Sequence, residues 1–433
     1  MKSLALFVVT SLALPVATRA QSLTLGGAVD AALASHPSVS AATARVYAAD
    51  ASGDAARATR LPGAAIDATL TRFQEPMVVA PFHNLDFSDP PTFDRTLVQG
   101  RLALAYTLFD GGVRSSRISG ADAMYDASRY GRSATEMSVI EETATAYVGV
   151  LSAQAVLDAA RAQVDALEGE ADRAQRRFDV GTSAELEVLR ARATLQEARA
   201  QLASAEARTV LSVRALARLM GVDAASISPE AMGDVTPTTS PGAADTSRSP
   251  IILQADRAAS AAEASVSEQR AGRLPTVQAG AGLLDFATLG GGHITEWQAG
   301  LQVSWPLFTG GARAASVRRA EAELAAARSD LDAARLQVAQ AVDVAETSVV
   351  EADARARALE AAVTQWDEVA RIEALALEAG SGVQGDLLRA QAGLFQARAG
   401  HAQARYDAVL SRIRLARAEG TLDRSWMDAA LEM

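Results

Sequence analysis

Residues 176–200, RRFDVGTSAELEVLRARATLQEARA, recur in the chain as residues 375–399, LALEAGSGVQGDLLRAQAGLFQARA. When the two stretches are aligned, these positions match without a gap: Gly181 with Gly380, Leu189 with Leu388, Ala191 with Ala390, Leu195 with Leu394, and Ala198-Arg199-Ala200 with Ala397-Arg398-Ala399. The same offset aligns YTLFDGG (106–112) with WPLFTGG (305–311). Internal repeats constrain the fold more strongly than local propensities. The chain is therefore predicted to contain two copies of one structural unit.

The two copies differ in length upstream of these motifs. There the offset grows by about 14 residues, and TRLPG (59–63) matches GRLPT (272–276). Copy one thus carries a longer insert between its Leu-Pro and Leu-Phe motifs. We divide the chain accordingly into a signal peptide (1–20), a first repeat (21–220), an inter-repeat linker rich in Pro, Ser and Thr (221–249), a second repeat (250–420) and a C-terminal tail (421–433).

The first 20 residues have the three parts of a secretory signal peptide. Lys2 supplies the positive start, residues 4–16 the apolar core, and residues 17–20, ATRA, the small residues before a cleavage site at Gln21. The apolar run is too short to span a bilayer comfortably as an anchor helix. The chain contains no cysteine, so we expect neither a lipid-anchoring thiol nor a disulfide framework in the exported protein.

The composition excludes several classes of function. The formal net charge is −11, and it falls to about −13 once Lys2 and Arg19 are removed with the signal peptide. Such acidity argues against a nucleic-acid-binding surface, which needs a basic stripe. Lys2 is the only lysine, so the mature chain has neither a phosphate-loop lysine nor a Schiff-base nucleophile. Abundant alanine with few aromatics is typical of long, slender helices.

Each copy ends in a predicted pair of long helices. No proline interrupts residues 113–179, and an unbroken helix of that length would extend about 100 Å. A turn at residues 180–183 and a second helix over 184–220 follow, with Gly181 as a left-handed C-terminal cap and Ser183 as the next N-cap. In copy two we expect a helix to Glu378, a turn at residues 380–382 and a return helix to Glu419. Shorter helices are predicted at 23–60, interrupted near His36-Pro37, and at 250–273.

Between the short and long helices of each copy, two segments alternate with period two. They predict strands at about 63–73, 96–108, 276–286 and 296–307. One face of these strands is apolar and includes Leu102, Leu104, Leu301 and Val303, whereas the other is small or polar. Strands of about 10 residues with this pattern fit a transmembrane barrel, although a soluble β-sandwich alternates in the same way. The signal peptide and the flanking helices favour the barrel.

Aromatic residues near the strand ends have the distribution of interfacial girdles. We place Trp297 at one level of this girdle and four other side chains at the opposite level: Tyr106, Phe109, Trp305 and Phe308.

No catalytic motif is found in the sequence. It lacks HExxH, GxSxG, CxxC and a glycine-rich phosphate loop between a strand and a helix. His83 and His293 fall in predicted loops between strands, where solvent-facing histidines are more common than a metal site. We therefore predict no enzyme activity, no cofactor and no bound metal.

The two hairpin turns carry equivalent acids, because Glu187 and Asp386 each lie six residues after their glycine. Acids in the first turn of a helix stabilise its dipole, and each could pair at i+3, with Arg190 or Arg389. Alternatively, both hairpins point into one aperture and these acids ring it. The residues alone favour the first interpretation without excluding the second.

Together these features resemble the TolC family of outer membrane efflux proteins. The resemblance rests on the opening SLTLGGAVDAALASHPSV, the paired RLP–strand–LF(D/T)GG blocks, the paired hairpins and the closing LARAEGTL. It implies a homotrimer with four strands per protomer in one 12-stranded outer-membrane β-barrel, and long helical hairpins that form a periplasmic α-barrel. It also implies an exit duct that works with a periplasmic adaptor and an inner-membrane pump.

The resemblance extends to particular residues. Glu187 and Asp386 match the family's acids after the hairpin glycine and would line the periplasmic aperture. Arg389 stands where the family has a further acid, which leaves the closing salt bridges unassigned, with Arg190 and Arg389 as the candidate partners. The hairpin tips lie farthest from the barrel, so we expect adaptor docking at Gly181, Thr182, Gly380 and Ser381. A periplasmic coiled-coil adaptor or scaffold is the alternative function.

Overall fold

The computed structural model describes residues 23–79, 88, 92–237 and 245–432, so the expected signal peptide and His83 lie outside the described residues. The chain forms two compact units. The first takes its described residues from Met1–His36, Glu136–Ala243 and Asp343–Met433, and the second from Pro37–Thr135 and Ala244–Val342. Each unit therefore combines parts of both sequence copies, and the long helices α3 (Val113–Asp179) and α6 (Ala312–Glu378) contribute to both.

The helices of the second unit are the short helices of each copy and the first parts of α3 and α6. The short helices are α2 (Pro37–Ala58) and α5 (Pro250–Ala271), and each begins at a proline, whose fixed φ suits an early helical position. Both end before the Leu-Pro motifs, as predicted. Ion pairs join the helices at their surfaces: Arg57–Asp122 (2.5 Å), Arg117–Glu268 (2.7 Å) and Arg270–Glu321 (2.6 Å).

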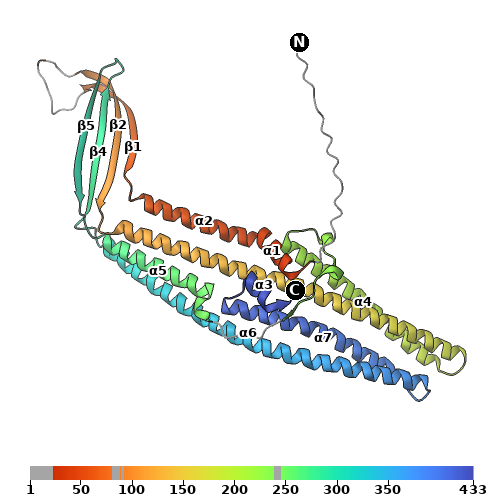
Figure 1. Cartoon of the computed structure of the whole chain (residues 1–433). Coiled ribbons are helices and arrows are strands. Elements are labelled where there is room, and N and C mark those ends of the chain that lie inside the picture. The colour runs from red at the N-terminus through yellow and green to blue at the C-terminus, as the bar shows by residue number, and fades with distance from the viewer. Residues whose placement is uncertain (1–22, 80–87, 89–91, 238–244, 433) are drawn as a thin grey trace, which may run out of the picture. The chain divides into compact units, whose positions relative to one another are not determined.

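The strands of the second unit form one antiparallel sheet in the order β1-β2-β4-β5 (Figure 1). The strands are β1 (Gly63–Val78), β2 (Phe93–Phe109), β4 (Thr276–Ala287) and β5 (His293–Ser304). Directly opposed residues share a face of a sheet, and the register aligns the alternating patterns of all four strands. One face carries rows such as Ile66–Leu102–Leu283–Trp297, and the other carries rows such as Ala65–Ala103–Gly282–Gln298.

The predicted ends of three strands are wrong. β5 stops at Ser304 rather than near residue 307, because its partner β4 begins at Thr276 and neither Pro275 nor Pro306 has an N–H to extend the ladder. Trp305 and Phe308 therefore lie beyond the strand. β1 and β2 are longer than predicted, and the insert of copy one extends their hairpin beyond the end of β4.

A bulge also changes which residue faces which side at the end of β2. Thr107 pairs with Gln278 of β4, and the neighbouring β4 residue, Val277, pairs with Phe109. Leu108 is therefore an extra residue in β2 without a partner in β4. Strict alternation would have placed Leu108 on the apolar face. The bulge places Phe109 there instead, in the row of Val277 and Val303.

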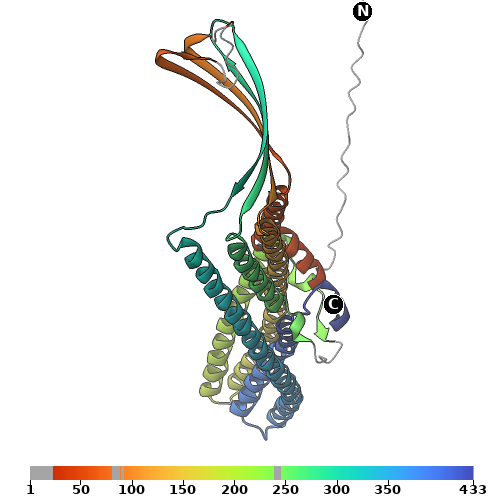
Figure 2. The ribbon, with the colours of Figure 1, turned by 90° about the vertical axis from the view of Figure 1, so that its left-hand side faces the viewer.

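The first unit consists of two helical hairpins and a short N-terminal helix. α3 pairs with α4 (Glu185–Met220), α6 pairs with α7 (Gln384–Glu419), and the turns of both hairpins lie at the same end of this unit (Figures 1 and 2). The N-terminal helix α1 (Leu25–Ser35) is capped by Thr24, whose hydroxyl accepts a hydrogen bond from the Gly27 N–H. The largest buried cluster is built around Leu25, Tyr147, Leu216, Ile413 and Met427.

The linker and the tail fold together, which their composition did not predict. β3 (Thr236–Pro237) of the linker pairs with β6 (Leu431–Glu432) of the tail, next to α8 (Arg424–Ala430). The described part of the linker also contains the short 3-10 helices η1 (Ala224–Ser226), η2 (Pro229–Ala231) and η3 (Thr246–Arg248). None of the helices in the described ranges is long and apolar enough to cross a membrane.

Two buried tyrosines fix the linker to the helices. The Tyr147 hydroxyl lies 2.7 Å from the carbonyl oxygens of both Leu23 and Gly233, and Tyr406 donates to Asp234. Burial, reinforced by the nearby Asp234 carboxylate, raises the pKa of Tyr406 to about 12. Tyr406 therefore remains a protonated donor throughout the physiological range.

Candidate functional site

The turn between α3 and α4 is closed by a glycine-dependent cap. Gly181 has φ +76°, a left-handed conformation that favours glycine. The Gly181 N–H donates to Phe178 O (2.8 Å) and the Thr182 N–H to Arg177 O (2.9 Å), the two bonds of a Schellman motif. The Thr182 hydroxyl also donates to Arg177 O (2.9 Å). The predicted cap at Gly181 is confirmed.

The turn between α6 and α7 repeats this geometry. Gly380 has φ +75°, its N–H donates to Leu377 O (3.2 Å), and the Ser381 N–H donates to Ala376 O (3.0 Å). The Ser381 hydroxyl donates to the same carbonyl (3.2 Å). Thr182 and Ser381 therefore have the same role in the two copies, and the sequence repeat is also a repeat of backbone conformation.

The predicted N-cap of the return helix is wrong. α4 begins after Ala184, not after Ser183, and no side chain caps it. α7 begins after Val383 in the same way. The Ser183 hydroxyl is buried without a hydrogen-bond partner. Because neither helix has a side-chain cap, an acid in its first turn is the available stabiliser of the positive helix end.

Glu187 and Asp386 both lie in these first turns. Asp386 forms an ion pair with Arg389, three residues further along α7, and 41% of its side chain is exposed. Glu187 is partly buried, and within the described part of the chain neither it nor Arg190 forms an ion pair. The structure therefore shows one local pair, Asp386–Arg389, in one hairpin and an unpaired acid at the equivalent position of the other.

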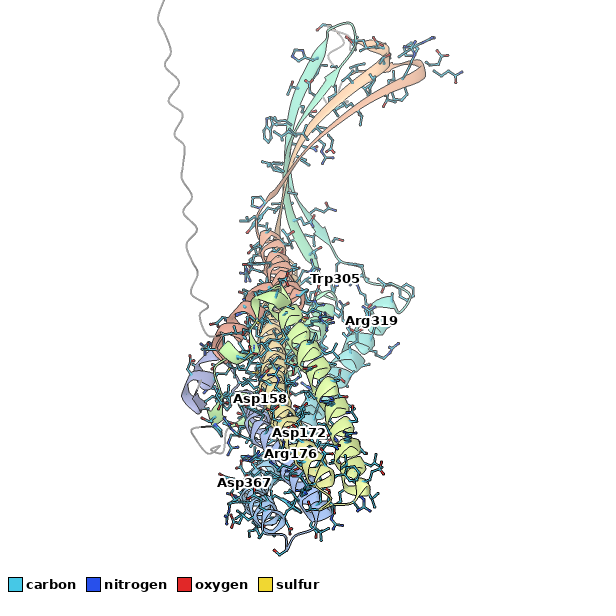
Figure 3. The ribbon with its side chains drawn as sticks, turned by 90° about the vertical axis from the view of Figure 1, so that its right-hand side faces the viewer. Asp158, Asp172, Arg176, Trp305, Arg319 and Asp367 are labelled. Carbon is cyan, nitrogen blue, oxygen red and sulfur yellow. The ribbon has the colours of Figure 1, made fainter. Side chains whose placement is uncertain are left out.

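A buried carboxylate joins the two hairpins close to these turns. Glu170 on α3 is fully buried, and its carboxylate accepts hydrogen bonds from Arg173 Nε (2.9 Å), Arg177 (3.1 Å) and Gln384 Nε2 (3.2 Å). Gln384 is the first residue of α7, so this bond links copy one to copy two. Figure 3 labels Asp172 and Arg176 on the same stretch of α3.

The sequence carries a local signal for this network. Glu170 interrupts an apolar stripe formed by Leu167, Ala171 and Ala174, which pack in one cluster. Arginines follow at i+3 and i+7, the positions that return to the same side of a helix. A charged residue inside an apolar stripe, with cations at that spacing, indicates a buried ion pair. Its third partner, Gln384, is distant in sequence and could not be inferred.

Apolar contacts reinforce the link between the hairpins. Leu388 of α7 belongs to the same buried cluster as Val188, Ala191 and Leu195 of α4. The hairpins also border a cleft of about 540 Å³, lined by residues of α3, α4 and α7 that include Ala160, Ser204, Arg208, Phe395 and Gly400. The ends of the two hairpins thus pack as one assembly within the first unit.

The described residues offer no metal site, because no group of three or more His, Asp or Glu side chains is placed to hold an ion there. His293 lies at the start of β5 and is exposed. The candidate site consists of helix ends, ion pairs and turns.

Comparison with known proteins identifies the family. Residues 28–222 and 246–421 match the model of the outer membrane efflux protein family. This chain belongs to that family. It is 30% identical to protein CyaE of Bordetella pertussis over 430 residues, which covers 96% of this chain and 87% of CyaE. It is 26% identical to the outer membrane protein TolC of Vibrio cholerae, covering 78% of this chain and 80% of that protein.

Solved structures show the same fold. The outer membrane protein VceC of Vibrio cholerae matches with a TM-score of 0.77 at 20% identity, over 92% of this chain and 96% of VceC. The open state of the MtrE outer membrane channel of Neisseria gonorrhoeae matches with a TM-score of 0.73 at 21% identity, over 96% of this chain and 94% of MtrE. The TolC-like fold expected from the sequence is confirmed.

These findings establish the broad function. The protein is an outer-membrane exit duct for efflux or type I secretion, with a large periplasmic portion. Proteins of this family and fold are channels rather than enzymes, and TolC-family channels act with adaptor and inner-membrane pump partners. The alternative of a periplasmic adaptor or scaffold is therefore excluded.

Proposed function

We propose that three copies of this chain close into one 12-stranded barrel and form a passive duct. The observation that supports this proposal is the sheet itself. Within the described residues, β1 and β5 each pair with another strand along one edge and leave the other edge open. An open sheet edge cannot lie in lipid, because its N–H and C=O groups would find no partner. Edge-to-edge pairing of β5 with β1 of another copy satisfies these groups, and the family resemblance implies three copies.

The periplasmic entrance of this duct is proposed to lie at the hairpin turns. Both turns lie at one end of the first unit, both have the same cap, and the hairpins share a buried cluster and the Glu170–Gln384 bond. Glu187 and Asp386 would line this entrance. Residues 181–182 and 380–381 would contact the adaptor, because they form the outermost backbone of each hairpin.

The proposal is tested by purifying the protein from outer membranes and inserting it into planar lipid bilayers. We expect heat-modifiable migration on gels and discrete current steps without pump or nucleotide, because the duct is passive. A correctly inserted, heat-modifiable protein that never conducts would contradict a channel role. Co-purification from the native cell then identifies the adaptor and the pump, and hence the cargo.

Removing the entrance acids is expected to change ion selectivity. Three protomers would place six carboxylates at one narrow level and attract cations there. The double variant Asp386→Asn, Glu187→Gln should therefore show lower cation preference and weaker block by multivalent cations in single-channel recordings. Arg389 offsets Asp386 locally, so we expect Glu187→Gln alone to account for more of the change.

The control for that measurement is Glu230→Gln with Asp245→Asn, which removes two exposed carboxylates from the linker. This pair should leave selectivity unchanged. If the entrance variant behaves like the linker variant, Glu187 and Asp386 stabilise only their own helix starts, a contribution of about 0.3–1 kcal/mol each.

Valine at Gly380 is expected to reduce export without preventing membrane insertion. The φ of +75° costs a β-branched residue roughly 1–2 kcal/mol, which would distort the turn proposed to meet the adaptor. A Cβ at Gly380 would meet nothing within 4 Å, so the effect is conformational rather than steric. Gly385→Val is the matched control, because that site is equally open but helical. If both variant proteins reach normal levels in the outer membrane and support export equally well, the tip at Gly380 is not part of the docking site.

A further inference from the structure

The segment that joins the sheet to the long helix differs between the two copies in its exposure. The apolar side chains of residues 305–308 are among the most exposed of the protein, and their copy-one equivalents are less so. The exposed fractions are 58%, 80% and 88% for Trp305, Leu307 and Phe308, against 40%, 51% and 48% for Tyr106, Leu108 and Phe109.

The cause is the early end of β5. In copy one the equivalent residues belong to β2 and stay close to β4, whereas residues 305–308 leave the sheet after Ser304. The segment is nevertheless held in place. Trp305 Nε1 donates to Arg273 O (3.2 Å), two residues after the end of α5, and Arg313 of α6 donates to Pro306 O (3.2 Å). Trp305 lies at the end of the sheet that is nearest to the helices, and Arg319 lies in the first turns of α6 (Figure 3).

The copies also differ in charge at this junction. In copy one, Asp110 and Arg114 form a half-buried ion pair at 2.7 Å. In copy two, Thr309 takes the place of the aspartate, so Arg313 lacks the equivalent carboxylate partner. Within the described residues, neither Arg313 nor Arg273 has a carboxylate partner. The exposed apolar segment thus contacts two arginines without carboxylate partners: Arg313 through its guanidinium group and Arg273 through its backbone carbonyl.

A second copy of the chain would not supply the missing negative charge. The other free edge of the sheet begins at Gly63, and the residue three positions before it is Arg60. Arg60 is exposed and has no carboxylate partner among the described residues. Pairing of β5 with β1 of another copy would therefore bring a further positive charge toward this end of the sheet.

We propose that residues 305–308, with Arg273 and Arg313, bind the headgroup of an anionic phospholipid in the periplasmic leaflet of the outer membrane. Trp305, Leu307 and Phe308 would enter the acyl boundary, where aromatic side chains concentrate. The two guanidinium groups would contact the phosphate, for which their fork geometry is suited. The copy-one junction does not form such a site, because Asp110 already neutralises Arg114. This inference rests on the proposed barrel and its orientation in the outer membrane.

Tryptophan quenching by brominated lipids tests this inference on the full-length protein in nanodiscs. The probes are brominated phosphatidylglycerol and brominated phosphatidylcholine at the same mole fraction. The quenching of Trp305 is obtained by subtracting the fluorescence quenching of the Trp305→Phe variant from that of the wild-type protein. We expect phosphatidylglycerol to be enriched at Trp305 by at least about fivefold, the factor expected from one arginine near an anionic surface. Arg313→Gln should lower this enrichment, and Arg313→Gln combined with Arg273→Gln should bring the two lipids close to parity.

Two internal controls separate the possible outcomes. Arg328→Gln removes an equally unpaired arginine about 22 Å further along α6 and should leave the preference intact. Trp297, 74% exposed on the apolar face of the sheet, reports insertion of the barrel. Equal quenching of Trp305 by both lipids would overturn the headgroup site. Quenching of Trp297 without Trp305 would show that protein covers the segment, whereas quenching of neither would overturn the barrel as well.

Discussion

Replacing Glu170 with alanine is expected to loosen the ends of the two hairpins by about 2–3 kcal/mol. Removing one member of a buried charge network leaves its partners uncompensated, which costs about 3–5 kcal/mol when all of them are buried. Arg173 and Arg177 are 44% and 29% exposed, so water recovers part of this cost. Hydrogen exchange of the first turns of α7 and the last turns of α3 should become roughly 30- to 150-fold faster.

Glu168→Ala is the matched control for that experiment. Glu168 lies half a turn earlier on α3 and pairs with Arg199 at 2.7 Å, but both side chains are about half exposed. Exposed pairs of this kind contribute about 0–1 kcal/mol. If Glu170→Ala changes exchange no more than Glu168→Ala does, the buried network does not hold the hairpins together.

Arginine at Leu301 is expected to destabilise the barrel by about 2–4 kcal/mol. Leu301 lies in the apolar face of β5, opposite Ala279 in a row shared with Tyr106, and 71% of its side chain is exposed. If this face contacts lipid, a charge near its centre must be desolvated or must deform the bilayer. The free energy of unfolding, measured by reversible denaturation in lipid vesicles, gives the cost directly.

Gln302→Arg is the control, because the neighbouring side chain belongs to the opposite face. Gln302 pairs with Gln278 and lines the hollow, polar side of the sheet with Gln298 and Arg101. Arginine there would face the lumen and should cost little. Equal destabilisation by the two variants would contradict the assignment of the apolar face to lipid.

The repeated hairpins were predictable because their determinants are local. A left-handed residue after a long helix needs glycine, so Gly181 and Gly380 locate both turns. Alternation likewise predicted which strand faces match, and the register of all four strands agrees. Both features depend on residues adjacent in sequence, and the internal repeat allowed each copy to be checked against the other.

Apart from the local N-cap at Ser183, the errors arose where distant residues decide the outcome. β5 ends at Ser304 because its partner β4 begins at Thr276, and the bulge at Leu108 depends on the same partner. The linker and the tail form a sheet only because α4 and α7 bring their ends together. The Glu170 network needs Gln384 from the other copy. None of these pairings leaves a periodic pattern in the sequence.

Disulfide cross-linking between the free edges of the sheet tests the central claim most directly. The chain contains no cysteine, so every disulfide that forms involves the introduced cysteines. Gln298→Cys on β5 would be combined in turn with Ala65→Cys, Asp67→Cys or Thr69→Cys on β1, all on the polar face by register. Opposed residues on neighbouring strands come within reach of a disulfide. After oxidation in outer membranes, the account predicts for at least one pair a non-reducing gel ladder that ends at three chains. A ladder that stops at two chains, continues beyond three, or shows only single chains with every pair would contradict it.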